Sequence, residues 1–360
     1  MNLNDLTRTL IDIQSITGDE LEVGRFLAAY LEEQRYRVEV QEIAPARANV
    51  IATTMSEPRV VFSTHMDTVP PHIGASEDQE YIYGRGSCDA KGIIAAQIFA
   101  AQKLREQGIE RLGLLFTVDE EAGSDGARAA NHHPAARSCR FLINGEPTEN
   151  TLAVGTKGSL RLRIKATGRA AHSAYPELGE SAIETLLDVL NDVRTCSWPS
   201  NAVLGETTCN IGRIDGGVRP NVIAENAEAD LQIRLTTPAD QVKSILEKTV
   251  AGRAEIEYLS VSEPMQLLAV DGFETSVVRF TTDIPHLTNW GTPLLFGPGS
   301  IHDAHTSHER VSKQDLAAAV DAYAKLARIL LARVAGETHR ARDEVSTTRS
   351  SGWVEGAGEA

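Results

Sequence analysis

His65 and Asp67 lie two residues apart at the end of an apolar, β-branched run that begins at Val60. Such a run is typical of a buried strand. Because side chains two residues apart in a strand point to the same side, the imidazole and the carboxylate can be neighbours. An imidazole that binds a metal ion through one nitrogen often has its other nitrogen held by a carboxylate. Taken alone, the pair is equally consistent with a surface histidine and aspartate that follow a core strand.

Further carboxylates and imidazoles occur where other predicted strands end. The complete set is His65, Asp67, Asp89, Glu120, Glu121, Glu146 and His305. Oxygen donors mixed with imidazole, without thiolates, are typical of catalytic zinc, cobalt or manganese. Each position also has an ordinary interpretation, such as a solvated acidic turn or a polar loop. If there were no metal site, all of these ordinary interpretations would have to hold at once. Because that combination is less probable than one shared site, we expect a metal site.

The set contains enough donors for two metal ions. If one carboxylate bridges the ions, a further carboxylate and an imidazole on each ion give three protein ligands per ion and leave a position for water. Ions about 3.5–4 Å apart can share a hydroxide nucleophile. Five residues satisfy this count: His65, Asp89, Glu121, Glu146 and His305.

Glu120 remains beside Glu121, and adjacent side chains in extended backbone point to opposite sides. Glu120 can therefore serve as a general base that deprotonates water and later protonates a leaving amine. Two other chemistries lack support in the sequence. Gly84-Arg85-Gly86 has neither the spacing of a dinucleotide-binding loop nor that of a P-loop. No serine or cysteine lies in a nucleophile elbow motif.

The composition excludes several classes of partner. The chain has 360 residues and a formal net charge of −15, and such a surface repels nucleic acids and anionic membranes. No apolar run has the roughly 20 residues that a membrane span needs. The four cysteines are scattered without a CxxC pair, which fits a reducing compartment. The first residues also show no secretory signal pattern. We therefore expect a cytoplasmic protein without nucleic-acid or membrane partners.

The elements that must position the chemical groups are strands that alternate with helices. Strands near 59–64, 112–118 and 140–143 each lead into one of the polar groups, and a helix near 92–107 follows Asp89. This alternation indicates a largely parallel or mixed α/β sheet, in which ligands bind at the carboxyl ends of strands.

The pattern changes after about residue 157. Apolar and charged side chains then alternate along two stretches, 160–165 and 227–235, so each predicted strand has one face in water. Helices near 180–195 and 239–251 complete a small α+β sandwich. Three parts of the chain are therefore expected: a metal-binding catalytic domain of 1–156 and 264–340, an inserted domain of 157–263, and a disordered tail of 341–360.

Two helices are predicted in the last third of the chain. One lies near 273–282, and the other runs from Gln314 to Ala335 with Gly336 as its C-cap.

With these residues in hand, the sequence resembles the family of dinuclear zinc amidohydrolases and peptidases that includes acetylornithine deacetylase, succinyl-diaminopimelate desuccinylase and aminoacylase. The matching stretches cover nearly the whole chain except the tail and occur in the family's order. They are 63–70 (STHMDTVP), 83–92 (YGRGSCDAKG), 117–124 (TVDEEAGS), 144–148 (NGEPT), 168–176 (GRAAHSAYP), 220–224 (PNVIA), 232–234 (QIR) and 297–306 (GPGSIHDAHT).

The resemblance implies a role for each residue of the metal site. It makes Asp89 the ligand that bridges two divalent ions, most often Zn²⁺, with Co²⁺ or Mn²⁺ as alternatives. His305 and Glu121 would bind one ion, and His65 and Glu146 the other. Asp67 would orient His65, and Glu120 would be the general base.

The resemblance also implies that the inserted domain is a lid that mediates formation of a homodimer. His172 would then reach the partner subunit's site and stabilise the tetrahedral oxyanion. Asn221 and Arg234 match lid residues that bind the substrate's carbonyl or carboxylate, and Gly299 belongs to the same substrate-binding set. The turn Thr306-Ser-His-Glu309 and the ending of 220–224 in alanine depart from the usual pattern near the substrate.

The segment 297–306 most resembles that of acetylornithine deacetylases. The expected substrate is therefore an N-acyl amino acid, N-acetyl-L-ornithine or a relative such as N-acetyl-L-citrulline, as used in arginine biosynthesis. Alternatives within the family are a succinyl-diaminopimelate desuccinylase, a general aminoacylase, a dipeptidase and a carboxypeptidase. Two hypotheses of other function classes remain: a catalytically inactive member of the family that acts as a scaffold dimer, and a two-metal phosphoesterase.

Overall fold

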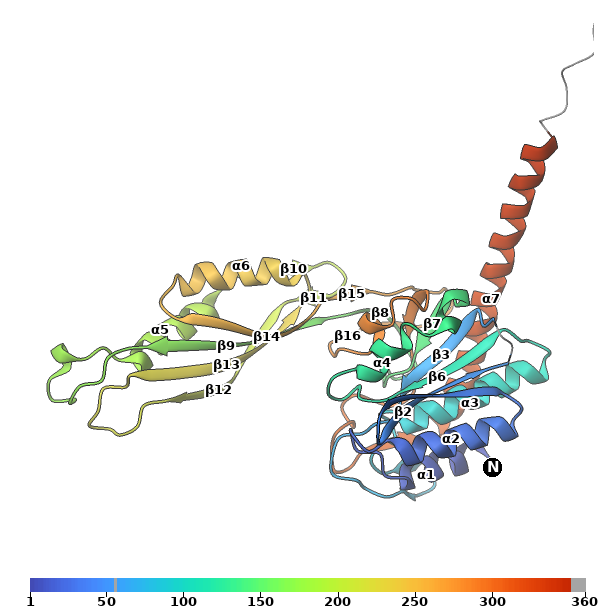
Figure 1. Ribbon diagram of the computed structural model, residues 1–360, viewed down its shortest axis with the longest axis horizontal. Coiled ribbons are helices and arrows are strands. Elements are labelled where there is room, and N and C mark those ends of the chain that lie inside the picture. The colour runs from blue at the N-terminus through green and yellow to red at the C-terminus, as the bar shows by residue number, and fades with distance from the viewer. Residues whose placement is uncertain (55–56, 351–360) are drawn as a thin grey trace, which may run out of the picture. The chain divides into compact units, whose positions relative to one another are not determined.

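A computed structural model describes residues 1–54 and 57–350 of the chain, with side chains described up to residue 336. The chain divides into two compact units, whose elements are labelled in Figure 1. The first unit contains Met1–Leu152, Val270–Glu274 and the chain from His286 onward. The second contains Ala153–Ala269 and Thr275–Pro285. Each unit is described by itself.

The first unit is built on a mixed sheet. Strand β3 runs parallel to both β6 and β7, β17 runs parallel to β7, and β2 runs antiparallel to β1 and β6. In spatial order the strands are β1 (Arg37–Ala44), β2 (Arg47–Thr53), β6 (Leu112–Thr117), β3 (Val60–His65), β7 (Phe141–Asn144) and β17 (Thr292–Leu295). Because β3, β6 and β7 are buried along their whole length, each begins with an uninterrupted non-polar run rather than an alternating pattern, and polar residues follow only at its carboxyl end.

Helices cover both faces of this sheet (Figure 1). Val61 and Leu115 point from one face toward Trp290 and the short helix α4, with which they form one buried cluster. Phe62 points from the opposite face to Tyr323, at a ring separation of 5.4 Å. The helices of the first unit are α1 (Leu3–Asp12), α2 (Leu21–Glu33), α3 (Lys91–Glu106), α4 (Asp125–Ala130) and α7 (Lys313–Ser350).

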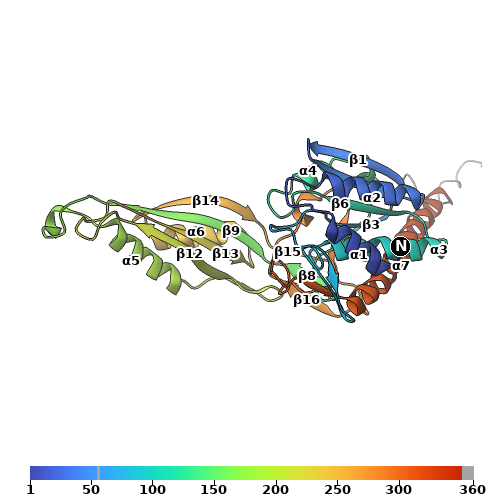
Figure 2. The same ribbon diagram turned by 90° about the horizontal axis from the view of Figure 1, so that it is seen from below.

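The second unit is an antiparallel sheet of four strands with helices α5 and α6 on one face (Figure 2). Apolar side chains from alternate positions of the central strands pack under both helices, as Leu162 and Leu231 do. The elements are β9 (Gly158–Thr167), α5 (Ala182–Thr195), β12 (Thr208–Gly216), β13 (Asn226–Leu235), α6 (Ala239–Val250) and β14 (Glu255–Ser262). The predicted mixed α/β fold with an inserted α+β sandwich is thus present.

The remaining strands are short. They are β4 (Ser76–Glu77), β5 (Tyr81–Tyr83), β8 (Leu152–Thr156), β10 (Ser200–Asn201), β11 (Gly205–Glu206), β15 (Met265–Gln266), β16 (Thr275–Val278) and β18 (Arg310–Ser312). Among the described residues, no helix has both the length and the apolar character needed to cross a membrane.

Two predicted helices differ from the observed elements. The predicted helix near 273–282 is wrong, because the chain there forms β16, where three of four residues, Thr275, Val277 and Val278, are β-branched and favour extended backbone. The last helix does not end at Gly336 but continues to Ser350. A single glycine costs a helix only about 1 kcal/mol, and good helix formers follow it. The tail predicted from residue 341 thus begins within this helix, and 351–360 lie outside the described residues.

The hydroxyl of Tyr323 connects α7 to the sheet edge. It is fully buried, donates to the carbonyl of Phe296 at 2.5 Å and accepts from Gln97 at 3.4 Å. Replacing Tyr323 with phenylalanine leaves both partners buried without this hydroxyl, and we expect a loss of about 1–2 kcal/mol in the free energy of unfolding. Urea unfolding of Tyr323→Phe measures it. The control is Tyr81→Phe, whose hydroxyl has no hydrogen-bond partner among the described residues; an equal loss in both variants would contradict the prediction.

Candidate active site

The predicted site residues follow neighbouring strands of the first unit. His65 is the last residue of β3, Glu120 and Glu121 follow β6, and Glu146 follows β7. Since β3 is parallel to both neighbours, these three strand ends lie at one edge of the sheet. His305 lies in the loop after β17, which is parallel to β7. The topology thus brings together residues that are far apart in the sequence.

Asp89 lies between two imidazoles. One carboxylate oxygen of Asp89 is 3.0 Å from Nε2 of His65, and the other is 3.2 Å from Nε2 of His305. The same nitrogen of His305 is 2.8 Å from Oε1 of Glu121. Ligand atoms of His65, Asp89 and Glu121 all lie within 4.8 Å of one another. An aspartate with one oxygen toward each of two histidines has the arrangement expected of a carboxylate that two cations share.

Asp67 fixes the histidine and the two glutamates at once. Its carboxylate is fully buried and lies 3.4 Å from Nδ1 of His65, which also contacts the Asp67 carbonyl at 3.0 Å. One carboxylate oxygen accepts the backbone N–H of Glu120 and the other that of Glu121, both at 3.1 Å. The hydroxyl of Thr17 donates a further hydrogen bond at 2.9 Å. Asp67 thus contacts both His65, which it was predicted to orient, and the backbone of the glutamate pair.

A largely buried ion pair that sequence reasoning missed supports the same turn. Asp119 has a positive φ of 70°, which an aspartate tolerates better than most residues. Its carboxylate pairs with Arg47 at 2.6 Å and accepts the backbone N–H of Asp125 at 3.2 Å. The conspicuous Asp-Glu-Glu run was the only available signal, because nothing in the sequence connects Arg47 with it.

Electrostatics in the cluster follow from these contacts. Burial alone would lower the pKa of His65, but its hydrogen bonds to Asp67 and Asp89 outweigh burial and hold that pKa well above its usual value. Hydrogen bonds to Asp89 and Glu121 raise the pKa of His305 to about 10. The pKa of Asp89 is lowered, because the two histidines outweigh the effect of its burial. The carboxylates thus create a site of strongly negative electrostatic potential, which favours the binding of cations.

Glu146 and Glu120 also lie near this place. Glu146 is buried, and the charges of both glutamates contribute to the raised pKa of His65. Imidazole nitrogens and carboxylate oxygens that converge without a thiolate form a donor set that suits a divalent metal ion of the zinc, cobalt or manganese type.

Gly299 occupies a position that only glycine fits. Its φ is +84°, and an added Cβ would lie 2.6 Å from Cβ of Cys88. The residue is buried against the loop that carries Asp89.

Three predicted site residues belong to the second unit. His172 is exposed, and its Nδ1 accepts the backbone N–H of Ala174 at 3.1 Å. The segment of Asn221 runs beside it, because the N–H of Ser173 donates to the Asn221 carbonyl at 3.1 Å. Arg234 lies elsewhere in this unit, half-buried on β13. The structure therefore brings His172 and Asn221 together within the second unit.

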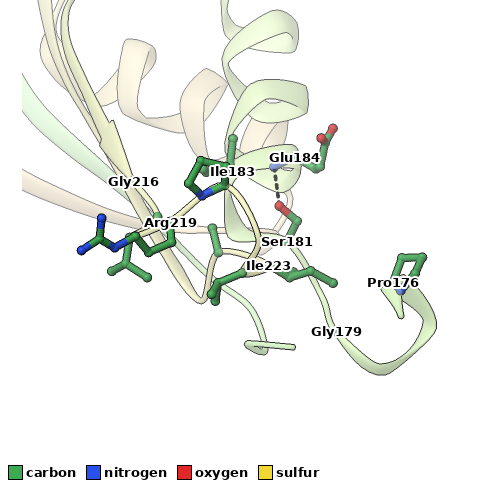
Figure 3. A pocket seen from close by; sticks show the side chains of 13 residues that line it. Pro176, Gly179, Ser181, Ile183, Glu184, Gly216, Arg219 and Ile223 are labelled. Atoms are coloured by element: carbon green, nitrogen blue, oxygen red, sulfur yellow. Dashed lines mark hydrogen bonds between the residues drawn. The ribbon is translucent and has the colours of Figure 1, made fainter. Parts of the chain in front are cut away.

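A cavity of about 670 Å³ lies next to the His172 and Asn221 segments (Figure 3). Its walls come from residues 176–184 and 216–224, and apolar side chains such as Ile183 and Ile223 predominate. Figure 3 shows Ser181 at one side of the cavity, where its hydroxyl caps helix α5 by accepting the N–H of Glu184 at 3.3 Å. The guanidinium of Arg219 points away from these residues.

Comparison with known proteins assigns the fold to a family. Residues 61–329 match peptidase family M20/M25/M40. An M20 domain-containing protein of Schizosaccharomyces pombe is 38% identical over 90% of this chain and 84% of its own length. A probable carboxypeptidase of Aspergillus flavus is 39% identical over 91% and 87%.

Solved structures show the same fold. The aminopeptidase PepT of Bacillus cereus superposes with a TM-score of 0.74 and 22% identity, covering 89% of this chain and 96% of its own. An M20 family metallo-carboxypeptidase of Sulfolobus solfataricus superposes with a TM-score of 0.69 and 16% identity, covering 90% and 98%.

The chain belongs to peptidase family M20/M25/M40. It is therefore an enzyme, a hydrolase of amide bonds that uses metal ions. This membership confirms the predicted family of metal-dependent amidohydrolases and peptidases, while the acetylornithine deacetylase subgroup stays a prediction.

Asp67→Asn tests how far metal binding depends on the buried carboxylate. The amide keeps one acceptor oxygen but turns an NH₂ group toward a backbone N–H, so either Glu120 or Glu121 loses its anchor. We expect the affinity for Zn²⁺ or Co²⁺ to fall by about 10- to 100-fold, as with other groups that orient metal ligands. Titration against a metal-binding dye measures it. Asp125→Asn, an exposed carboxylate of the same turn, is the control, and equal affinities in the two variants would contradict the prediction.

Proposed function

We propose that the protein hydrolyses the amide bond that joins an acyl group or peptide to an amino acid with a free α-carboxylate. Two supports are independent of each other. The donor set around Asp89 suits the metal-assisted attack of water on an amide carbonyl. The half-buried guanidinium of Arg234 suits a carboxylate ligand, and this observation carries the assignment of the substrate class.

Arg234 differs from Arg163 and Arg213, which lie on the same face of its sheet and are ion-paired, and from Arg161 on that face, which is exposed. Arg163 pairs with Asp230 at 2.6 Å, and Arg213 pairs with Glu228 at 2.8 Å and Asp215 at 2.6 Å. For Arg234, the described residues provide no ion pair, and burial lowers its pKa. A partly desolvated guanidinium without a counter-ion is well suited to a bidentate bond with a ligand carboxylate.

We propose that two divalent metal ions, Zn²⁺ by preference and otherwise Co²⁺ or Mn²⁺, are held by a set of five residues. When bound, they would polarise the substrate carbonyl and lower the pKa of water. Glu120 then accepts a proton from the attacking water and returns it to the leaving amine nitrogen. His172 donates a hydrogen bond to the developing oxyanion. The five ligands are His65, Asp89, Glu121, Glu146 and His305.

The acyl side of the substrate has two candidates. The likeness of 297–306 to acetylornithine deacetylases favours N-acetyl-L-ornithine or N-acetyl-L-citrulline. The name probable carboxypeptidase, given to several relatives at 37–39% identity, favours the carboxyl-terminal bond of a peptide. Both candidates carry the free carboxylate that Arg234 would bind.

We also propose a homodimer through the second unit, in which Asn221 and Gly299 contribute to substrate binding. Large apolar side chains are exposed there, among them Val218, Leu178 and Tyr175 at 78%, 60% and 58% of their surface. Strand β12 is the edge of its sheet and offers unpaired backbone groups. Burial of such side chains against a second copy would remove apolar surface from water.

Glu120→Gln separates the general base from the metal ligands. The amide has nearly the same shape but cannot accept a proton, so we expect kcat to fall by about two to four orders of magnitude while metal content stays unchanged. Amine release and metal analysis of the purified protein measure the two quantities. Glu110→Gln, an exposed glutamate before β6, is the control for charge. Turnover at the wild-type rate would contradict the assignment of the base.

Arg234→Met tests recognition of the carboxylate. We expect kcat/KM to fall by about 10-fold or more for substrates with a free α-carboxylate, because a charge-assisted bond is lost. The measurement is amine release from N-acetylornithine, N-acetylcitrulline, succinyl-diaminopimelate, other N-acetyl amino acids, dipeptides and longer peptides.

The same panel includes the α-carboxamide of each preferred substrate. Wild type should discriminate against the carboxamide, and Arg234→Met should lose that discrimination. Arg161→Met, an exposed arginine of β9, is the matched control. Preference for peptides in the wild type would discard the acetylornithine assignment, and equal rates on acid and carboxamide would contradict the substrate class.

A further inference from the structure

Glu309 lies at a position that the proposed chemistry does not use. It follows His305 by four residues, and its carboxylate is buried, with the residue only 1% exposed. The loop Gly84–Asp89, by contrast, belongs to a different part of the chain and carries the central carboxylate of the site. The contacts of Glu309 run almost entirely to this loop.

One oxygen of Glu309 closes the loop through its backbone. Oε1 accepts the N–H groups of Gly86 at 2.9 Å, Asp89 at 3.2 Å and Cys88 at 3.3 Å. The carbonyl of Glu309 also accepts the N–H of Gly84 at 3.0 Å. In a buried turn these backbone N–H groups need acceptors. A single carboxylate oxygen of Glu309 accepts from three of them.

The other oxygen pairs with the side chain of the same loop. Oε2 of Glu309 lies 2.6 Å from Nη1 of Arg85, which is 2% exposed. A buried carboxylate is costly unless it is paired and hydrogen-bonded, and here both conditions are met. The ion pair with Arg85 therefore holds Glu309 beside the loop through Oε2, while Oε1 binds the backbone.

We propose that Glu309 is a positioning residue that holds Asp89 where its two carboxylate oxygens face His65 and His305. The bond to the Asp89 N–H fixes the backbone from which that carboxylate projects. Because Glu309 and His305 share one short segment, the same bond also sets the distance between the Asp89 loop and the His305 loop. The inference rests on the proposed role of Asp89 as the ligand that two ions share.

A merely stabilising ion pair would behave differently, and two double variants distinguish the cases. Glu309→Gln with Arg85→Met removes both charges but keeps an oxygen that can accept the loop N–H groups. Glu309→Ala with Arg85→Met removes both charges and the acceptor. The comparison therefore isolates the acceptor from the charge pair.

The readout is the titration of metal-free protein with Co²⁺, followed by visible absorption and by metal analysis after gel filtration. Wild type should bind two ions. We expect the alanine–methionine variant to bind at least one ion 10-fold or more weakly, and the glutamine–methionine variant to lie between it and wild type. Thermal unfolding of the metal-free proteins is measured in parallel. A pair of variants that both lose stability but bind two ions like wild type would overturn the proposal.

Controls separate the remaining outcomes. Arg163→Met with Asp230→Asn removes an ion pair of the second unit and should leave both Co²⁺ affinities unchanged. If the alanine–methionine variant does not fold, Glu309→Asp replaces it. The shorter side chain keeps the carboxylate but moves it one methylene away from the loop, and we again expect at least one Co²⁺ ion to bind 10-fold or more weakly. Wild-type affinity in Glu309→Asp would then overturn the proposal. A wild type that binds fewer than two ions would instead overturn the dinuclear assignment, and the role of Glu309 with it.

Discussion

The site depends on one buried carboxylate, that of Asp67. Its two oxygens accept the N–H groups of two consecutive residues after β6, while Asp67 itself follows β3. The ends of two parallel strands are thereby held at a fixed distance, and the histidine at the end of one strand meets the glutamates at the end of the other. Since a buried charge is tolerated only with such partners, the geometry is strongly determined.

Ion pairs behind the site extend this constraint outward. Arg47 pairs with Asp119 before the glutamates, and Arg85 pairs with Glu309 behind Asp89. Breaking one partner of a buried pair typically costs about 3–5 kcal/mol, because the other charge is left uncompensated. The carboxylates of the site repel one another. Each ion pair therefore helps to hold the neighbouring carboxylates, those of the glutamates or of Asp89, in place against this repulsion. A site rich in like charges can stay assembled before any cation binds it.

The sequence was sufficient for the sheet and for the residues at its edge. The continuous apolar runs of β3, β6 and β7 are readable without knowledge of their neighbours, and polar residues after such runs fall at one sheet edge by topology. It was insufficient where the partner is distant or the local preference is weak. Arg85 and Glu309 are 224 residues apart, so no pattern connects them. Gly336 indicated a helix end, but its local cost is too small to decide one.

The residues proposed for the reaction are divided between the two units. The acids and histidines proposed to bind metal ions all lie in the first unit. The exposed His172 and the guanidinium of Arg234, which has no ion pair among the described residues, lie in the second. Solved structures with this fold bear names as different as aminopeptidase, tripeptidase and metallo-carboxypeptidase, with TM-scores of 0.74, 0.75 and 0.69. In the proposed function, recognition of the substrate carboxylate falls to the polar face of the second unit, where Arg163 and Arg213 pair with carboxylates and Arg234 has no ion pair among the described residues.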